Sequence, residues 1–198
     1  MRAITVYYVT TLYTLVPPIC RGEGEDAVLD RAGILPYTIA IGGGRMRIAF
    51  ARLEGRDGHT VGRELLAKLC GGNVPEIAVT PQGKPYFVDK NLHFSISHTK
   101  NHAFCCVSDV NVGLDAEEID RRVSPALADK ILSPREKRRC AADAAILRLW
   151  VLKEAYAKLT GKGLGNYLYE TDFDPSDPRV LIIDGCFVAV MEEERNAV

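Results

Sequence analysis

Acidic side chains alternate along the segment Asn111–Glu117 in a pattern that suits a divalent cation. On a β-strand, residues two apart face the same side, so Gly113, Asp115 and Glu117 share one face while Leu114 lies on the other. Two carboxylates side by side repel each other unless a cation or a proton lies between them. The spacing alone fits the solvated face of an edge strand equally well, because acidic residues are usually exposed.

A second segment, Trp150–Lys158, has helical spacing. Trp150, Glu154 and Lys158 are four residues apart and lie along one stripe. Three carboxylates and one or two lysines can therefore meet between a strand and a helix, and hard oxygen ligands are what Mg²⁺ prefers. The alternative is an ordinary surface pair between Glu154 and Lys158. The segment Ala144–Leu159 is apolar over much of its circumference, which predicts a buried helix whose charges, Lys153 included, need partners.

Strands and helices must position these groups. We predict helices at 60–70 and 144–159 and a basic helix that starts with the capping box Ser133-Pro-Arg-Glu136. Predicted strands are 2–10, 37–41, 77–80, 92–97, 103–107, 111–117, 167–173, 180–183 and 186–190. The strands at 92–97, 103–107 and 111–117 are expected to form an antiparallel meander. Asp184-Gly185 is a strong two-residue hairpin signal.

Composition limits the function classes. The chain has 198 residues, of which 47% are hydrophobic and 26% charged, as in a globular protein of one large or two small domains. A formal net charge of -1 argues against a nucleic-acid partner. Six cysteines without a Cys-x-x-Cys spacing predict free thiols in a reducing, cytoplasmic location. The apolar run 3–19 is interrupted by threonines and tyrosines, so we expect neither a cleaved leader nor a membrane span.

Arginines follow the flexible Gly42–Gly44 segment. They are Arg45, Arg47, Arg52 and Arg56. Guanidinium groups fit phosphate oxygens, so these residues are candidates for a phosphate-binding patch. A solvated face is the commoner role for such residues.

Four motifs in order resemble those of the 4'-phosphopantetheinyl transferase family, of the broad-specificity type that activates peptide and polyketide synthetases. They are Gly83-Lys-Pro85, Phe94-Ser-Ile-Ser-His98, Val112-Gly-Leu-Asp-Ala-Glu117 and Trp150-Val-Leu-Lys-Glu-Ala-Tyr-Ala-Lys158, followed by Gly161-Lys-Gly-Leu164. The resemblance covers about residues 58 to 165. One such motif would be a weak signal, whereas four in order are specific.

The resemblance implies an α+β fold built as a pseudo-dimer of two similar α/β subdomains with the active site in the cleft between them. We expect an N-terminal subdomain at 1–108 that binds coenzyme A and a C-terminal subdomain at 109–198 that carries the metal and the catalytic helix. The implied reaction moves the phosphopantetheine arm of coenzyme A onto a serine of a carrier protein, with Mg²⁺ (or Mn²⁺) as cofactor, and releases adenosine 3',5'-bisphosphate.

The resemblance also implies residue roles. Asp115, Glu117 and Glu154 would bind the metal, and Glu154 would take the serine proton directly or through a metal-bound water. Lys158 would hold the pyrophosphate and stabilise the leaving group, with Lys153 assisting. Further coenzyme contacts would come from Ser97, His98, Lys84 and Pro85. His59, His93 and His102 lie outside the matched residues and are expected to be structural or exposed.

The first third departs from the family pattern, in which a longer basic region holds the 3'-phosphate. Arg45, Arg52 and Thr60 are the candidates that this chain offers. A carrier protein acidic around its serine would dock on Arg135, Lys137, Arg138 and Arg139, although a solvated surface explains these residues equally well.

Two other functions compete with the transferase. One is a Mg²⁺-dependent pyrophosphohydrolase of coenzyme A or nucleotides that uses the same acidic cluster. The other is a carrier-protein binder without activity, against which the intact set of Asp115, Glu117, Glu154 and Lys158 argues. We expect the protein to be a monomer.

Overall fold

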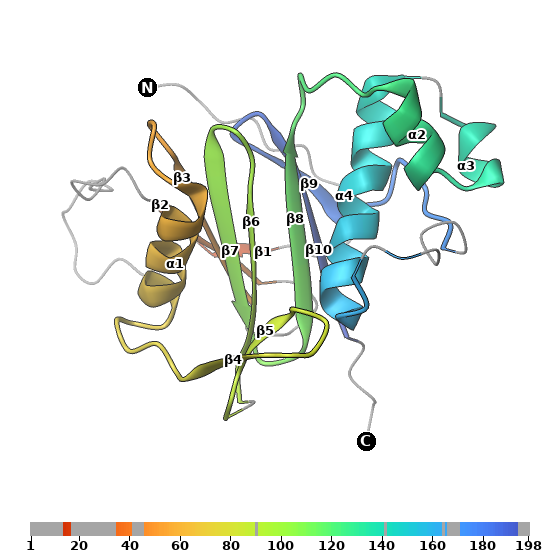
Figure 1. The fold of residues 1–198 in the computed structure, drawn as a ribbon. Helices are drawn as coiled ribbons and strands as arrows, with labels where there is room; N and C mark the ends of the chain where they lie inside the picture. Colours follow the sequence, from red (N-terminus) through yellow and green to blue (C-terminus); the bar gives the residue numbers. More distant parts are fainter. Residues whose placement is uncertain are drawn as a thin grey trace.

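Two antiparallel β-sheets pack face to face, and each carries a helix on its outer face (Figure 1). The structure is a computed structural model. It describes residues 46–89, 91–140, 142–163, 165 and 171–193 with their side chains, and the backbone of 14–16 and 35–40. The order of layers is α1, first sheet, second sheet, α4, which is a mixed α/β architecture with hydrophobic residues between every pair of layers.

The first sheet has the strand order β1-β2-β3-β7-β6. Its strands are β1 (Thr14–Val16), β2 (Leu35–Ala40), β3 (Arg47–Arg52), β6 (His93–His98) and β7 (His102–Ser108). Helix α1 (Gly58–Leu69) covers its outer face with Val61, Leu65, Leu66 and Leu69. Asp57 caps this helix, because its carboxylate accepts a hydrogen bond from the Thr60 amide.

The second sheet has the order β8-β10-β9. Its strands are β8 (Val112–Glu118), β9 (Val180–Ile183) and β10 (Cys186–Glu192). Helix α4 (Asp143–Thr160) covers its outer face and packs against the short helices α2 (Pro125–Ile131) and α3 (Pro134–Lys137). Gly161 ends α4 in the left-handed conformation, with φ 68°.

The inner faces of the two sheets share one hydrophobic core. Its buried members are Met46, Ile48, Phe104, Cys106, Val112, Leu114, Ala116, Cys186, Val188 and Val190. This burial fixes which way β8 faces. Leu114 and its even-numbered neighbours point at the first sheet, so the odd-numbered Gly113, Asp115 and Glu117 face α4, as their alternation predicts.

Serine side chains join the edges of the two sheets, where β6 lies beside β8. The Ser95 hydroxyl accepts the Leu114 amide at 3.0 Å. The Ser97 hydroxyl accepts the Ala116 amide at 3.3 Å. These contacts take the place of a backbone ladder and satisfy buried polar groups between the sheets. A small hairpin, β4 (Ile77–Val79) and β5 (Pro85–Phe87), lies at one end of this junction.

Several predicted elements are confirmed. Helices α1 and α4 begin and end within two residues of their predicted bounds. Asp184 and Gly185 form the predicted hairpin turn with φ 46° and 78°, the pair of positive values that such a turn requires. The capping box of Ser133 and Glu136 is present.

The predicted three-strand meander is wrong. Strands β6 and β7 pair as expected, but β8 pairs with β10 in the other sheet. A period of two shows that a segment is a strand and does not select its partner. The basic helix is also shorter than expected, since α3 ends at Lys137 and leaves Arg139 beyond it. Strand β3 and helix α2 were not predicted, and 171–173 is not a strand.

Some predictions fall on residues that the structure does not describe, namely the strand at 2–10, most of 167–173 and Arg45. Five of the cysteines lie within the described residues, and all five are free thiols, as expected. No helix in the described part of the chain has the length and apolar character needed to cross a bilayer.

Candidate active site

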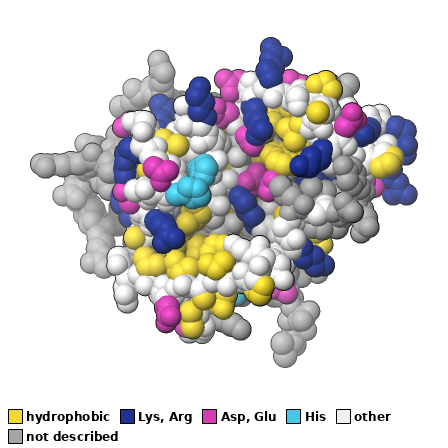
Figure 2. Space-filling view, in the orientation of Figure 1, with side chains coloured by type: hydrophobic (Ala, Val, Ile, Leu, Met, Phe, Trp, Pro, Cys, Tyr) yellow, Lys and Arg dark blue, Asp and Glu magenta, His cyan; other side chains and the backbone are white. Residues whose placement is uncertain are grey.

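A cavity of about 580 Å³ opens where the two sheets meet. It is lined by α1, the β4–β5 turn, β6, β8 and α4. The polar lining residues are His59, Arg63, Gln82, Lys84, Ser95, Ser97, His98, Asp115, Glu117, Trp150, Glu154 and Lys158. Figure 2 shows acidic and basic side chains close to histidine near the middle of this face, beside a hydrophobic surface. Residues far apart in the sequence therefore converge on one polar depression.

Asp115 and Lys158 form the central contact of this cavity. The Lys158 ammonium donates to Asp115 Oδ1 at 2.7 Å and to the Ile96 carbonyl at 3.3 Å. The Ser97 hydroxyl donates to the same carboxylate oxygen at 2.8 Å. Asp115 is only 6% exposed, so a cation and a hydroxyl hold a nearly buried carboxylate in one orientation.

Glu117 lies two residues further along the same face of β8. Its carboxylate accepts the Trp150 indole N–H at 3.1 Å and also pairs with Arg121. Burial raises the pKa of Glu117, although Arg121 acts against this. Trp150 is the first residue of the predicted Trp150–Glu154–Lys158 stripe, so this hydrogen bond links α4 to β8.

Glu154 is the third carboxylate of the cavity. Burial raises its pKa to about 7, the negative charge of Asp115 adds to the increase, and Lys158 opposes it. The mutual repulsion shows that the three carboxylates share one electrostatic environment. Asp115 and Glu117 come from one face of β8 and Glu154 from one stripe of α4, as their spacing in the sequence predicts.

The donor set fits Mg²⁺ in its chemistry, because three residues offer carboxylate oxygens beside an open cavity. Among the described residues, however, no group of three or more histidine, cysteine or acidic side chains is already gathered around one point as metal ligands. Asp115 and Glu117 are instead held by Lys158, Ser97, Trp150 and Arg121. A metal would have to displace part of these contacts.

Gly113 explains how α4 comes so close to β8. A Cβ atom at this position would lie 2.0 Å from the Ala155 carbonyl oxygen and 2.5 Å from the Leu159 nitrogen. The missing side chain lets the last two turns of α4 rest on the strand, which brings Lys158 within reach of Asp115.

Comparison with known proteins shows that part of the chain is similar to a known family. Residues 111–184, which span β8, α4 and β9, match the 4'-phosphopantetheinyl transferase superfamily. This segment belongs to that superfamily. The transferase gsp of Aneurinibacillus migulanus is 34% identical over 88 residues, and psf-1 of Bacillus pumilus is 35% identical over 80. HetI of Nostoc is 32% identical over 151 residues.

These similarities cover parts of the proteins compared. The aligned segments take up 41%, 37% and 65% of this chain and 36%, 34% and 62% of gsp, psf-1 and HetI respectively. All three relatives are named 4'-phosphopantetheinyl transferases. The match to the superfamily includes all three candidate metal ligands and Lys158.

The remaining predicted contacts divide into those that line the cavity and those that do not. Lys84, Pro85, Ser97 and His98 line the cavity with the metal-ligand candidates. The Lys84 ammonium is directed away from open solvent, donating to Asn111 Oδ1 at 2.7 Å and to the Leu159 carbonyl at 2.8 Å. His98 is exposed, and its ring contacts that of His59 with centroids 4.7 Å apart.

The second group lies outside the cavity lining. Lys153 is fully buried and pairs with Glu136 at 2.7 Å, so α4 directs it towards α3. Thr60 donates its hydroxyl to Asp57 at the start of α1. Arg52 pairs with Asp184 through two hydrogen bonds of 2.7 Å.

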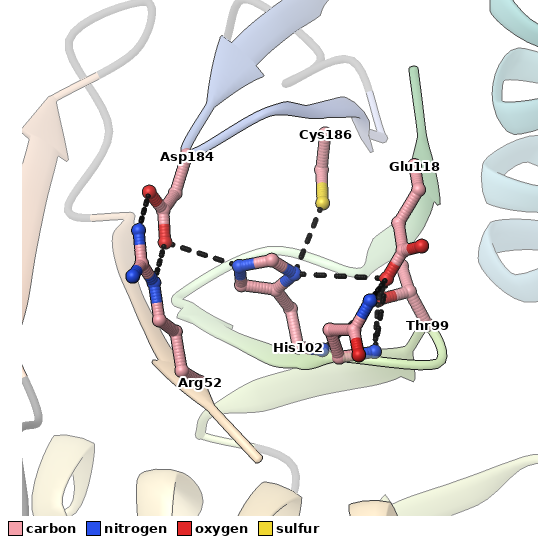
Figure 3. Close-up of polar contacts among 7 residues, drawn as sticks. Arg52, Thr99, His102, Glu118, Asp184 and Cys186 are labelled. Carbon is pink, nitrogen blue, oxygen red and sulfur yellow. Dashed lines mark hydrogen bonds and ion pairs between the residues drawn. The ribbon is translucent and has the colours of Figure 1, made fainter. Parts of the chain in front are cut away.

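Figure 3 shows how Arg52 joins a polar cluster that links the two sheets. Asp184 accepts from Arg52 and lies 3.0 Å from His102 Nε2. On its other side, the His102 ring lies 3.4 Å from the Cys186 sulfur. Because β3 and β7 belong to the first sheet and Asp184 and Cys186 to the second, the cluster is a connection between the sheets.

Two titratable residues of the cavity lining lie outside the sequence motifs. His59 and Arg63 lie four residues apart on α1 and both line the cavity. Their spacing was the available signal, since it puts both on one face of the helix. His59 is exposed, as expected, but at the wall of the site.

On the proposed docking surface, Arg135 pairs with Asp172 and Lys137 with Asp129, while Arg138 and Arg139 are exposed.

Proposed function

We propose that this chain transfers the 4'-phosphopantetheine group of coenzyme A to a serine of an apo carrier protein. The observation that carries the proposal is the contact between Lys158 and Asp115, with Glu117 and Glu154 lining the same cavity. The match of residues 111–184 to the transferase superfamily supports it. The serine oxygen forms a bond to the β-phosphorus of coenzyme A, the pyrophosphate P–O bond breaks, and adenosine 3',5'-bisphosphate leaves.

Asp115, Glu117 and Glu154 would hold Mg²⁺, with Mn²⁺ as a substitute. When bound, the metal would neutralise charge on the pyrophosphate. Lys158 stands beside the same carboxylates and stabilises negative charge on the departing phosphate. The serine hydroxyl gives its proton to Glu154, directly or through water, because Glu154 lines the cavity and no hydrogen bond from another described residue engages its carboxylate.

The 3'-phosphate of the coenzyme would bind towards α1. The His98 ring contacts that of His59 on α1, and Ser97 and Arg63 line the same cavity. We therefore propose His59 and Arg63 as contacts of the 3'-phosphate in place of Arg52 and Thr60, whose side chains are engaged with Asp184 and Asp57. Pro85 and the stem of Lys84 would lie beside the adenine.

The two sheets with their helices suggest the family's pseudo-dimer, with halves at 1–108 and 109–198 and the cavity between them. A carrier protein acidic around its serine would dock near Arg138 and Arg139, which are exposed on the same half as Glu154. The transferase would act as a monomer in the cytoplasm on fatty-acid, polyketide or peptide-synthetase carriers.

The experiment is the intact mass of an apo carrier protein after incubation with the chain, coenzyme A and Mg²⁺. A gain of one phosphopantetheine, absent with a chelator and absent with Glu154→Gln, supports the transferase. Release of free phosphopantetheine without a carrier would instead support the hydrolase. An unmodified carrier together with no Mg²⁺-dependent coenzyme A binding would support a binder without activity.

A further inference from the structure

Lys84 makes contacts that differ from those of a phosphate-binding lysine. Its ammonium donates to Asn111 Oδ1 at 2.7 Å and to the Leu159 carbonyl at 2.8 Å, so two of its three N–H groups are used within the protein. Its methylenes pass Gly161, where an added Cβ would lie 3.3 Å from Lys84 Cδ. The side chain therefore reaches across from the β4–β5 turn to the end of α4.

The Leu159 carbonyl is a specific target. It belongs to the last turn of α4, whose carbonyls have no partner within the helix and form the negative end of its dipole. Asn111 donates to the same carbonyl from its Nδ2 at 3.0 Å. A lysine of the N-terminal half and an asparagine before β8 thus hold one carbonyl together.

The residue before Leu159 is Lys158, whose ammonium must reach Asp115 on β8. Two features hold this last turn in place. Gly113 lets it rest on β8 from one side, and Lys84 with Asn111 binds its free carbonyl. The turn that carries Lys84 is itself braced, since the Lys84 amide donates to the Thr80 hydroxyl and the Thr80 amide to the Lys84 carbonyl.

We propose that Lys84 is a positioning residue: with Asn111 it clamps the Leu159 carbonyl and so keeps Lys158 against Asp115 during the reaction, while its ammonium does not bind coenzyme phosphate. The inference rests on the proposed transferase function for its kinetic consequence. The clamp itself is a property of the protein without substrate.

The test compares Lys84→Met, Asn111→Leu and the double variant. Asn111 does not line the cavity, so it reports on the clamp alone. We expect each single variant to lower kcat about tenfold by displacing Lys158, while the dissociation constant of coenzyme A measured by calorimetry stays within about twofold. The double variant should lose little more than either single one, because both act on one carbonyl. Lys84→Arg, which keeps donors for that carbonyl, should recover most of kcat.

Lys68→Met is the matched control, because Lys68 is an exposed lysine in the last turn of α1 and lies outside the cavity. It should leave kcat unchanged. Amide hydrogen exchange separates the clamp from the proposed function: in both Lys84→Met and Asn111→Leu, the Gly161 amide, which bonds to the Ala157 carbonyl, should exchange several-fold faster even if no transfer activity is found.

A weaker affinity for coenzyme A in Lys84→Met, tenfold or more, with unchanged kcat and no effect of Asn111→Leu, would overturn the proposal and make Lys84 a direct coenzyme ligand. Unchanged exchange at the end of α4 in both variants would also overturn it.

Discussion

Lys158 Nζ lies 2.7 Å from Asp115 Oδ1, and this contact ties α4 to β8 at the centre of the cavity. The two residues are 43 positions apart, and they meet because Gly113 lets the helix rest on the strand. Lys158 also donates to the Ile96 carbonyl of the other sheet. One ammonium group therefore organises three elements around the site.

Replacing Lys158 by methionine should remove most of the activity. The variant loses the positive charge that we assign to the leaving phosphate, so kcat should fall by about 10²- to 10³-fold. The measurement is the rate of carrier modification at saturating coenzyme A. Lys130→Met, an exposed lysine on α2, is the control. More than a tenth of wild-type kcat in Lys158→Met would remove Lys158 from its proposed role.

Gly113→Ala should destabilise the fold. The added Cβ would lie 2.0 Å from the Ala155 carbonyl oxygen, so α4 must shift from β8, at a cost of about 3 kcal/mol or more. Urea unfolding gives the free energy of unfolding. Gly71→Ala is the comparison, because a Cβ atom at Gly71 would meet no atom within 4 Å and only the positive φ of 69° opposes it. This substitution should lower the free energy of unfolding by about 1 kcal/mol. Equal losses in the two variants would refute the close approach.

The stability of the metal-free protein should depend on Glu154 in a defined direction. Its pKa in the folded protein is about 7, above the ordinary 4.5, so the folded state binds this proton more tightly than the unfolded state. The stabilising contribution is complete below pH 4.5 and is lost as the pH rises through 7. Glu154→Gln should therefore raise Tm relative to the wild type more at pH 8 than at pH 5, both in chelator. A Tm difference independent of pH would contradict the raised pKa.

Arg63 and Arg52 should differ in their effect on coenzyme affinity. Arg63 lines the cavity, whereas Arg52 pairs with Asp184 at a surface site. We expect Arg63→Met to weaken coenzyme A binding about tenfold and 3'-dephospho-coenzyme A binding much less. Arg52→Met should leave both affinities unchanged and cost less than about 1 kcal/mol of stability. Calorimetry with the two ligands decides, and an equal loss for both ligands in Arg63→Met would remove it from the 3'-phosphate.

Local patterns predicted the parts of the fold that local physics determines. The period of two in β8 and the four-residue spacing in α4 placed Asp115, Glu117, Glu154 and Lys158 correctly on their faces, because burial of the opposite faces leaves no other orientation. The Asp184-Gly185 turn was equally readable, since few residues accept two successive positive φ angles.

Such local patterns do not predict which distant strands pair. The partner of β8 is a strand some 70 residues later, and the connection at Asp109–Asn111 carries no mark that the chain changes sheets. For a related reason, the sequence does not show which partners its charged residues have. Lys153 and Arg52 look like ligands for phosphate in the sequence, yet their partners Glu136 and Asp184 become neighbours only in the folded chain. Arg63 was overlooked because only the folded chain shows that its helix face borders the cavity.

We propose that carboxylates from β8 and α4 hold one divalent ion beside Lys158. Binding of Mn²⁺, followed by electron paramagnetic resonance in the presence of coenzyme A, tests it most directly on the wild type and on Asp115→Asn, Glu117→Gln and Glu154→Gln. We expect one bound ion in the wild type and an affinity at least tenfold weaker in each variant that remains folded. Wild-type affinity in all three folded variants, or no Mn²⁺ binding by the wild type, would contradict it.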